Sequence, residues 1–279
     1  IYTMDYRLIA FDLDGTFLDS EKNIPERNMA ALKAAAEKGV YAVPATGRIF
    51  AGIPEELKSA PFIRYYVCIN GAYVYDSAED EVVYRAEIPV GEALRFYEYM
   101  DTLPVYYDCY QDNTGWMTES MLENAADFMP DRGILRLIKT LRIPVPELKA
   151  ALRAKDRPIQ KLQVYCRDQE LRSRLLRDLP ELFPELLFSS SVSSNIEVNS
   201  RDAGKDKGLA ALCARLGFGM QQAIAFGDGI NDADMLRAAG LGIAMENAEE
   251  QVKAAADYTT SDNNSGGVGA AIEKFILRS

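Results

Sequence analysis

Two aspartates, Asp12 and Asp14, follow directly after the short apolar run 8–11, which has the length of a strand buried on both faces. If the backbone stays extended, both carboxylates leave on the same side. At about 4 Å they repel by roughly 4 kcal/mol even at an effective dielectric of about 20, so they need a cation or a shared proton. Gly15 lets the chain turn and offers a backbone N–H to an anion. This stretch predicts a phosphate and metal site, and the alternative is a solvated acidic turn.

Polar residues also stand after three other predicted strands, or at the start of the helix that follows. They are Thr46, Gly47, Arg48, Lys207, Asp228, Asn231 and Asp232. If the strands are neighbours in one parallel sheet, these groups converge on its carboxyl edge, where doubly wound sheets bind their ligands. Taken together, the four groups are far more specific than an isolated pair of acids.

This set of residue types suits the transfer of a phosphoryl group, which depends on positioning and on neutralising negative charge. Asp12 and Asp228 are hard oxygen ligands of the kind that Mg²⁺ prefers. Lys207 can act as a point charge on the phosphate and on an attacking carboxylate. Asp14 is then available to donate a proton to the leaving group.

The remaining phosphate oxygens need neutral donors. Thr46 offers a hydroxyl and Gly47 a backbone N–H, while Arg48 either binds substrate phosphate or pairs with an acid. Asn70 precedes a glycine after a strand and is more typical of a turn than of a substrate contact. Asp19 and Glu21 are expected to be solvated surface acids.

Composition excludes several classes of function. The chain has 279 residues, 48% of them apolar, which suffices for about two domains. Its net charge of −11 argues against a nucleic-acid or membrane-surface binder, because both partners are anionic. The absence of histidine excludes Ser-His-Asp catalysis and His-ligated zinc. The four cysteines form no C-x-x-C pair and suit a reduced, cytoplasmic protein, and we find neither a secretory leader nor a membrane-length apolar run.

Apolar runs alternate with helical patterns at both ends of the chain, which predicts right-handed parallel units and a doubly wound α/β sheet. The strands expected in this sheet lie at 8–11, 40–43, 65–69, 195–198, 223–226 and 242–245. The middle of the chain alternates less regularly and holds a hairpin, strands near 105–110 and 159–166, and helices at 92–100 and 170–176. We therefore expect a core of residues 1–85 and 193–279 and an inserted α+β domain of residues 86–192.

Four segments resemble, in chain order, the four signature motifs of the haloacid dehalogenase-like hydrolase superfamily. They are the D-L-D-G-T, A-T-G-R, K-G-L-A-A-L and F-G-D-G-I-N-D-A-D-M-L sequences, and the match extends to N-G-A at 70–72 and A-M-E-N-A at 244–248. The sequences of these motifs are similar to those of the Cof-type branch, whose members are mostly Mg²⁺-dependent phosphatases. The position of the insertion, after the second motif, resembles the α/β caps that close over the core and supply substrate specificity, with hinges near residues 85 and 192.

The resemblance implies a role for each matching residue. Asp12 would be the nucleophile that becomes an aspartyl phosphate, and Asp14 the acid that protonates the leaving group. Thr46 and Lys207 would hold the phosphate, with Lys205 as the alternative lysine. The Mg²⁺ ligands would be Asp12, the Asp14 carbonyl and Asp228, with Asn231 and Asp232 completing the site.

We therefore expect a phosphatase that acts on a small phosphorylated metabolite, such as a sugar phosphate or a phosphorylated cofactor like a flavin or pyridoxal phosphate. It would be a monomer or a weak homo-oligomer, without nucleic-acid or membrane partners. A phosphomutase of the same superfamily is one alternative, which would release no free phosphate. A binding protein that has lost turnover is another, and the intact motifs speak against it.

Overall fold

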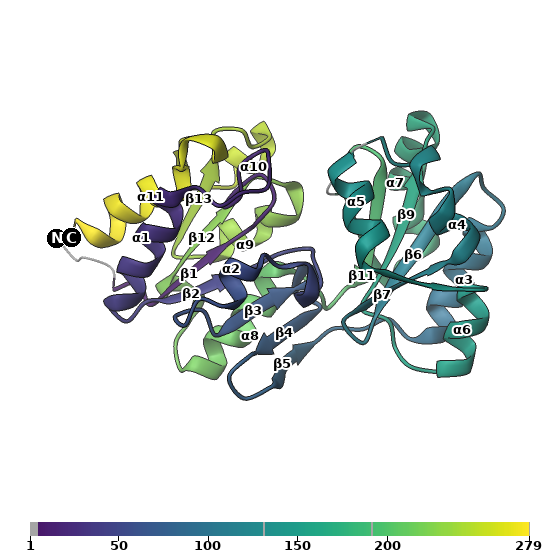
Figure 1. The fold of residues 1–279 in the computed structure, drawn as a ribbon, viewed down its shortest axis with the longest axis horizontal. Helices are drawn as coiled ribbons and strands as arrows, with labels where there is room; N and C mark the ends of the chain where they lie inside the picture. Colours follow the sequence, from purple (N-terminus) through teal and green to yellow (C-terminus); the bar gives the residue numbers. More distant parts are fainter. Residues whose placement is uncertain (1–4, 131, 191, 279) are drawn as a thin grey trace. The chain divides into compact units, whose positions relative to one another are not determined.

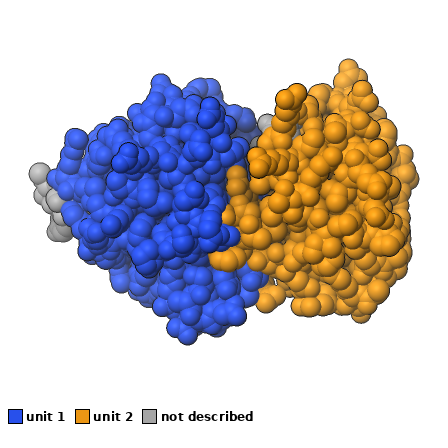
Figure 2. Space-filling view, viewed as in Figure 1, with its two compact units in different colours: residues 1–47, 54–84, 204–279 blue, residues 48–53, 85–203 orange. Residues whose placement is uncertain are grey.

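The computed structural model describes residues 5–130, 132–190 and 192–278, which fold into two compact units, coloured separately in Figure 2. The core unit contains residues 1–47, 54–84 and 204–279. The inserted unit contains residues 48–53 and 85–203. Its far limit is Ala203 rather than a residue near 192, where the sequence pattern put it.

A parallel sheet forms the centre of the core unit, with the strand order β14-β13-β12-β1-β2 (Figure 1). These strands are β1 (Leu8–Phe11), β2 (Tyr41–Pro44), β12 (Ala223–Gly227), β13 (Leu241–Met245) and β14 (Tyr258–Thr260). Phe11 pairs with Pro44 on one side and with Phe226 on the other, so three strands end at the same edge. The predicted doubly wound α/β core is confirmed.

Helices cover both faces of this sheet (Figure 1). On one face α1 (Glu26–Glu37) packs against α11 (Gly267–Ile272) and its continuation η7 (Glu273–Leu277). On the other face lie α8 (Lys205–Leu216), α9 (Ala233–Ala238) and α10 (Glu250–Lys253), whose apolar side chains pack against Leu8 and Ala10. Single helical turns are η4 (Met220–Gln222), η5 (Ile230–Asp232) and η6 (Asn263–Ser265).

The predicted third strand leaves the main sheet. It is β3 (Tyr65–Cys68), which touches the β2 segment through one parallel bridge between Ala45 and Val67 and then pairs with a hairpin. The hairpin strands are β4 (Tyr73–Asp76) and β5 (Glu81–Arg85), in the order β3-β4-β5. The turn η2 (Ile69–Gly71) joins β3 to β4, and the short helix α2 (Glu55–Lys58) precedes β3.

The inserted unit is built on an antiparallel sheet with one parallel pair, in the order β10-β11-β9-β6-β7-β8. Its strands are β6 (Val105–Gln111), β7 (Thr114–Thr118), β8 (Arg142–Val145), β9 (Lys161–Cys166), β10 (Leu186–Ser189) and β11 (Asn195–Ser200). One face packs on α3 (Val90–Met100), α6 (Leu148–Lys155) and α7 (Gln169–Leu182). The other helices of the unit are α4 (Glu119–Glu123), α5 (Arg132–Leu141), η1 (Phe50–Gly52) and η3 (Ala125–Asp127).

The assignment of residues 195–198 to the parallel core sheet is wrong. They belong to β11, which pairs antiparallel with β9 and β10 in the inserted unit. The physical reason is visible in the side chains, because Asn195, Glu197 and Asn199 alternate with Ile196 and Val198. Such alternation is typical of an antiparallel sheet with two different faces, whereas strands of a doubly covered parallel sheet are continuously apolar. β14 takes the remaining place in the core sheet.

Within the described part of the chain, no helix has the length and apolar character needed to cross a membrane.

Candidate active site

The loop after β1 is held at the carboxyl edge of the core sheet by its own backbone. The Asp12 N–H donates to the Phe226 carbonyl (3.0 Å), which continues the pairing of β1 with β12. The Asp12 carbonyl accepts from the Phe17 N–H (3.1 Å), and the Leu13 carbonyl accepts from Leu18 (2.9 Å). The first acid therefore sits in a closed turn directly beyond a strand, with only 7% of its surface exposed.

Three carboxylates converge on this edge. Asp12, Asp228 and Asp232 each offer an oxygen, and these oxygens all lie within 4.8 Å of one another. The ammonium of Lys205 is buried among them, 2.6 Å from Asp12 Oδ1 and 2.6 Å from Asp232 Oδ1. One cation thus faces three acids, which leaves the cluster with an excess of negative charge.

Hydrogen bonds divide the carboxylate oxygens into occupied and available ones. Asp232 Oδ2 accepts from the backbone N–H groups of Asp228 (3.1 Å) and Gly229 (3.0 Å), so both of its oxygens have donors. The Thr16 hydroxyl donates to Asp228 Oδ1 (2.6 Å). Among the described residues, Asp12 Oδ2 and Asp228 Oδ2 receive no hydrogen bond. Asp12 and Asp228 thus supply hard carboxylate oxygens of the kind that Mg²⁺ prefers, and Asp232 is held beside them by Lys205 and two backbone N–H groups.

The electrostatics of the cluster reflect this crowding. Burial, together with the neighbouring carboxylates, raises the pKa of Asp12 well above its ordinary value, although Lys205 opposes the shift. Burial and Asp232 raise the pKa of Asp228 to about 6, against the hydrogen bond from Thr16. Burial alone would lower the pKa of the Lys205 ammonium, but Asp12 and Asp232 raise it above its ordinary value. A bound divalent cation would relieve the repulsion that holds these carboxyl pKa values up.

Gly15 is required by the close approach of two loops. Its φ of +83° lies in the left-handed region, and a Cβ there would lie 2.2 Å from Asp228 Oδ2. Only glycine allows the turn after Asp14 to pass this close to the second acidic loop.

The structure places Lys205, and not the predicted Lys207, among the carboxylates at the acidic edge. Lys205 is the first residue of α8 and is 1% exposed, whereas Lys207 is exposed. Two residues along a helix rotate the side chain by about 200°, so the two lysines point to nearly opposite sides. The residues that fix this phase are Gly208 and Leu209, which are buried on the sheet side of the helix.

Asp14 lies apart from the three converging carboxylates. Its Oδ1 is 2.8 Å from the ammonium of Lys22, and both side chains are partly exposed. The Asp14 backbone forms an isolated bridge with Leu18 inside the same turn.

The other predicted phosphate contacts occupy different surroundings. Thr46 is buried just beyond β2, where its N–H donates to the Val67 carbonyl (2.8 Å). Gly47 lies beside Asn70, because a Cβ on Gly47 would lie 2.9 Å from Asn70 Oδ1. Asn231 Nδ2 donates to the same Oδ1 (3.2 Å). Arg48 belongs to the inserted unit, where its guanidinium donates to the Gly52 carbonyl (2.7 Å).

The sequence interpretation gave Thr16 no separate role, whereas Asn70 lies in a turn, as expected. Thr16 is fully buried, and its hydroxyl orients Asp228. The pairing of β1 with β12 brings these two residues together, and no local sequence pattern shows this contact. Asn70 is 6% exposed and lies in a left-handed turn with Ile69 and Gly71, where all three residues have positive φ. A positive φ is rare in a β-branched residue such as Ile69, and backbone strain of this kind is concentrated at functional sites.

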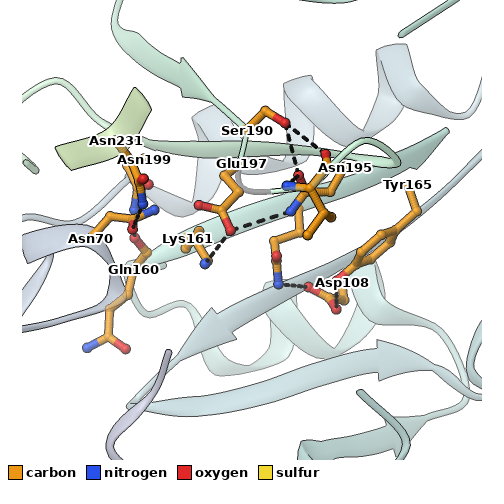
Figure 3. A network of polar contacts seen from close by, with 12 residues as sticks. Asn70, Asp108, Gln160, Lys161, Tyr165, Ser190, Asn195, Glu197, Asn199 and Asn231 are labelled. Carbon is orange, nitrogen blue, oxygen red and sulfur yellow. Dashed lines mark hydrogen bonds and ion pairs between the residues drawn. The ribbon is translucent and has the colours of Figure 1, made fainter. Parts of the chain in front are cut away.

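The inserted unit carries its own buried polar network on one face of its sheet (Figure 3). The Lys161 ammonium lies 3.1 Å from Glu197 Oε1, and both side chains are almost fully buried. Nearby, the Asp108 carboxylate accepts hydrogen bonds from Gln163 (3.0 Å), Tyr165 (2.9 Å) and Arg142 (2.6 Å). The charged groups buried on this face are thus paired with one another or hydrogen-bonded, as buried charges require.

Comparisons with known proteins agree with this geometry. A family model described as haloacid dehalogenase-like hydrolase matches residues 9–272. The 5-amino-6-(5-phospho-D-ribitylamino)uracil phosphatase YcsE of Bacillus subtilis is 31% identical over 275 residues, covering 98% of this chain and 97% of that protein. The pyridoxal phosphate phosphatase YbhA of Escherichia coli is 28% identical over 289 residues, covering 98% and 100%.

The solved structure of BT4131, named as a subclass IIB sugar phosphatase, is also similar. It superposes with a TM-score of 0.81 at 25% identity, covering 96% of this chain and 98% of that one. The acidic edge, the inserted unit and these similarities lead to one assignment. This chain belongs to the haloacid dehalogenase-like hydrolases and is a phosphoric monoester hydrolase of their Cof-type branch.

Proposed function

We propose that this protein hydrolyses the phosphate monoester of a small metabolite in two steps, through an aspartyl phosphate on Asp12. The observation that carries the proposal is the buried Lys205 ammonium, which holds Asp12 Oδ1 and leaves Oδ2 without a donor from the described residues. A carboxylate fixed by one oxygen presents the other as a nucleophile in a defined direction.

In the first step, Asp12 Oδ2 forms a bond to phosphorus while the bond from phosphorus to the leaving oxygen breaks. Asp14 supplies the proton that this oxygen takes up, and is left as a carboxylate. In the second step, Asp14 accepts a proton from the water that attacks phosphorus, and Asp12 is released together with inorganic phosphate. Lys205 balances charge on Asp12 in both steps, while Thr46 and Gly47 donate to phosphate oxygens.

Mg²⁺ is the proposed cofactor, with Asp12, Asp228 and the Asp14 carbonyl as protein ligands. When bound, it would neutralise charge shared between the substrate phosphate and Asp12. Asp232 would orient the groups around the ion, because the Lys205 ammonium and the backbone N–H groups of Asp228 and Gly229 occupy its oxygens. Asn231 would complete the site beside Asp232, where its side-chain amide donates a hydrogen bond to Asn70.

The proposed substrate is a phosphorylated sugar or cofactor precursor. The names of the similar proteins support this class, because each denotes a phosphatase of a small organic phosphate. We further propose that the protein works in the cytoplasm as a monomer or weak homo-oligomer, and its four cysteines are buried and free, as a reducing compartment permits.

A screen of phosphorylated metabolites for release of inorganic phosphate, with and without Mg²⁺, tests the proposal. Asp12→Asn serves as the inactive control. Release of phosphate by the wild type alone supports hydrolysis. Conversion of a substrate to an isomer without free phosphate would show a phosphomutase, and binding without either reaction would show a silent binding protein.

A further inference from the structure

The turn that follows the catalytic loop is more elaborate than a solvated acidic turn. Asp19 Oδ1 accepts hydrogen bonds from the backbone N–H groups of Glu21 (2.9 Å) and Asn23 (2.8 Å). The backbone closes the turn, because Asp19 N–H donates to Asn23 O (2.9 Å) and Lys22 N–H donates to Asp19 O (3.0 Å). Asp19 is only half-buried, and its carboxylate also organises the turn through these hydrogen bonds.

Three asparagines from the far end of the chain hold this loop in place. Asn264 Oδ1 accepts from the Ser20 N–H (2.9 Å), and Asn263 Nδ2 donates to the Leu18 carbonyl (2.9 Å). Asn247 Nδ2 donates to the Gly15 carbonyl (2.8 Å), and its Oδ1 accepts from Asn263 N–H (3.0 Å). The loop is thus fixed at both of its ends.

The result of this construction is the position of Lys22. Its φ of +70° lies in the left-handed region, and its ammonium lies 2.8 Å from Asp14 Oδ1. A non-glycine residue in that region is strained, whereas an exposed ion pair adds little to stability. The ion pair with Asp14 therefore does not offset the strain in the Lys22 backbone, which indicates that the contact serves something other than stability.

We propose that Lys22 is a positioning residue that holds the Asp14 carboxyl in the direction required for proton transfer. This inference rests on the proposed function. When Asp14 gives its proton to the leaving oxygen, the O–H bond of the acid breaks and a carboxylate remains beside the Lys22 ammonium. The same contact then orients that carboxylate to take the proton from the attacking water.

Two aryl phosphates of nearly equal size measure this role. The nitrophenolate of p-nitrophenyl phosphate leaves with little help from an acid, whereas the more basic phenolate of phenyl phosphate needs a proton. Single-turnover release of the phenol isolates the first step. In Lys22→Met we expect the rate for phenyl phosphate to fall about tenfold more than the rate for p-nitrophenyl phosphate, with KM little changed.

The matched controls are Lys22→Arg, which keeps the ion pair and should restore the wild-type ratio, and Lys33→Met, which removes an exposed lysine of α1. Asp19→Ala removes the acceptor of the turn and should reproduce part of the change in rate ratio seen in Lys22→Met. Asp19→Asn keeps an acceptor oxygen and should keep the wild-type ratio. Combined with Lys22→Met, Asp19→Ala should add little, since both changes remove the same contact.

Other outcomes would overturn the inference. An equal fall of the phenyl phosphate and p-nitrophenyl phosphate rates in Lys22→Met would mean that Lys22 acts on Asp12 or on the fold. No fall in either rate would mean that Lys22 does not position Asp14. A rise in KM for both substrates with weaker inhibition by inorganic phosphate would make Lys22 a phosphate ligand. If the wild type hydrolyses neither aryl phosphate and no metabolite, the proposed function fails instead.

Discussion

The ammonium of Lys205 lies 2.6 Å from Asp12 Oδ1, although 192 residues separate them in the chain. This contact joins the loop after β1 to the first turn of α8, and through Asp232 it reaches the loop after β12. It ties the acid that would attack phosphorus to the cation that balances it. The following predictions depend on this contact and on the backbone that supports it.

Lys205→Met and Lys207→Met form a matched pair on one helix. The first removes the cation from beside two buried acids and should cost about 3–5 kcal/mol of stability and about 10²-fold or more in kcat. The second changes an exposed residue and should stay within about 0.5 kcal/mol. Thermal unfolding and steady-state kinetics measure both effects. The opposite ranking would return the role to Lys207.

Asp12→Asn should lower turnover by at least about 10³-fold while leaving the fold intact. The amide keeps the volume of the acid and removes one of three crowded negative charges, so Tm should move by no more than about 4 °C. Asp234→Asn, an exposed acid on α9, is the control. A large loss of Tm in Asp12→Asn alone would mean that Asp12 is structural.

The stability of the metal-free protein should record the raised pKa of Asp228. Its pKa rises from 3.8 to about 6 on folding, so the folded state binds the proton more tightly than the unfolded state. Its contribution to stability is therefore present below about pH 4 and is lost as pH rises to about 6. Relative to Asp228→Asn, the wild type should lose of the order of 1–3 kcal/mol across this window. Urea unfolding of both proteins at several pH values in a chelator measures this loss, and a wild type that gains stability relative to Asp228→Asn between about pH 4 and pH 6 would contradict it.

Vanadate and beryllofluoride mimic the phosphoryl group and should bind only with Mg²⁺. The reason is that Asp12 and Asp228 carry an excess of negative charge, which repels an anion until a cation neutralises it. A Tm shift with both components, absent with either alone and abolished by a chelator, is the expected result. Anion binding that a chelator leaves unchanged would count against the metal assignment.

Gly71→Ala and Gly39→Ala separate backbone strain from crowding. Both glycines have φ near +85°, but a Cβ on Gly71 would lie 1.9 Å from the Gly204 carbonyl, whereas Gly39 has nothing within 4 Å. Gly39→Ala should cost about 1–2 kcal/mol and leave activity intact. Gly71→Ala should cost at least about 2 kcal/mol more and lower kcat, because it displaces the start of α8 that carries Lys205. Equal costs would show that the approach to Gly204 tolerates the methyl group.

The class of the fold and the principal acids could be predicted from the residue pattern alone. Continuous apolar runs such as 8–11, ending in Asp12 and Asp14, indicate buried parallel strands whose ends must hold charge. The same reasoning brought Asp228 and Asp232 to this edge, because parallel strands end together. The sequence also indicated that an irregular domain is inserted, although its far limit was set too early.

Which lysine joins the acids could not be predicted in this way, because the phase of a helix depends on the face that it buries and not on the residue types of a motif. Packing also places β11 in the inserted unit and brings the Thr16 hydroxyl to Asp228, and the local backbone sets the hydrogen bonds by which Asp19 organises its turn. Each of these depends on a contact between segments that are distant in sequence or on a backbone angle. Local residue patterns carry no record of either until the chain has packed.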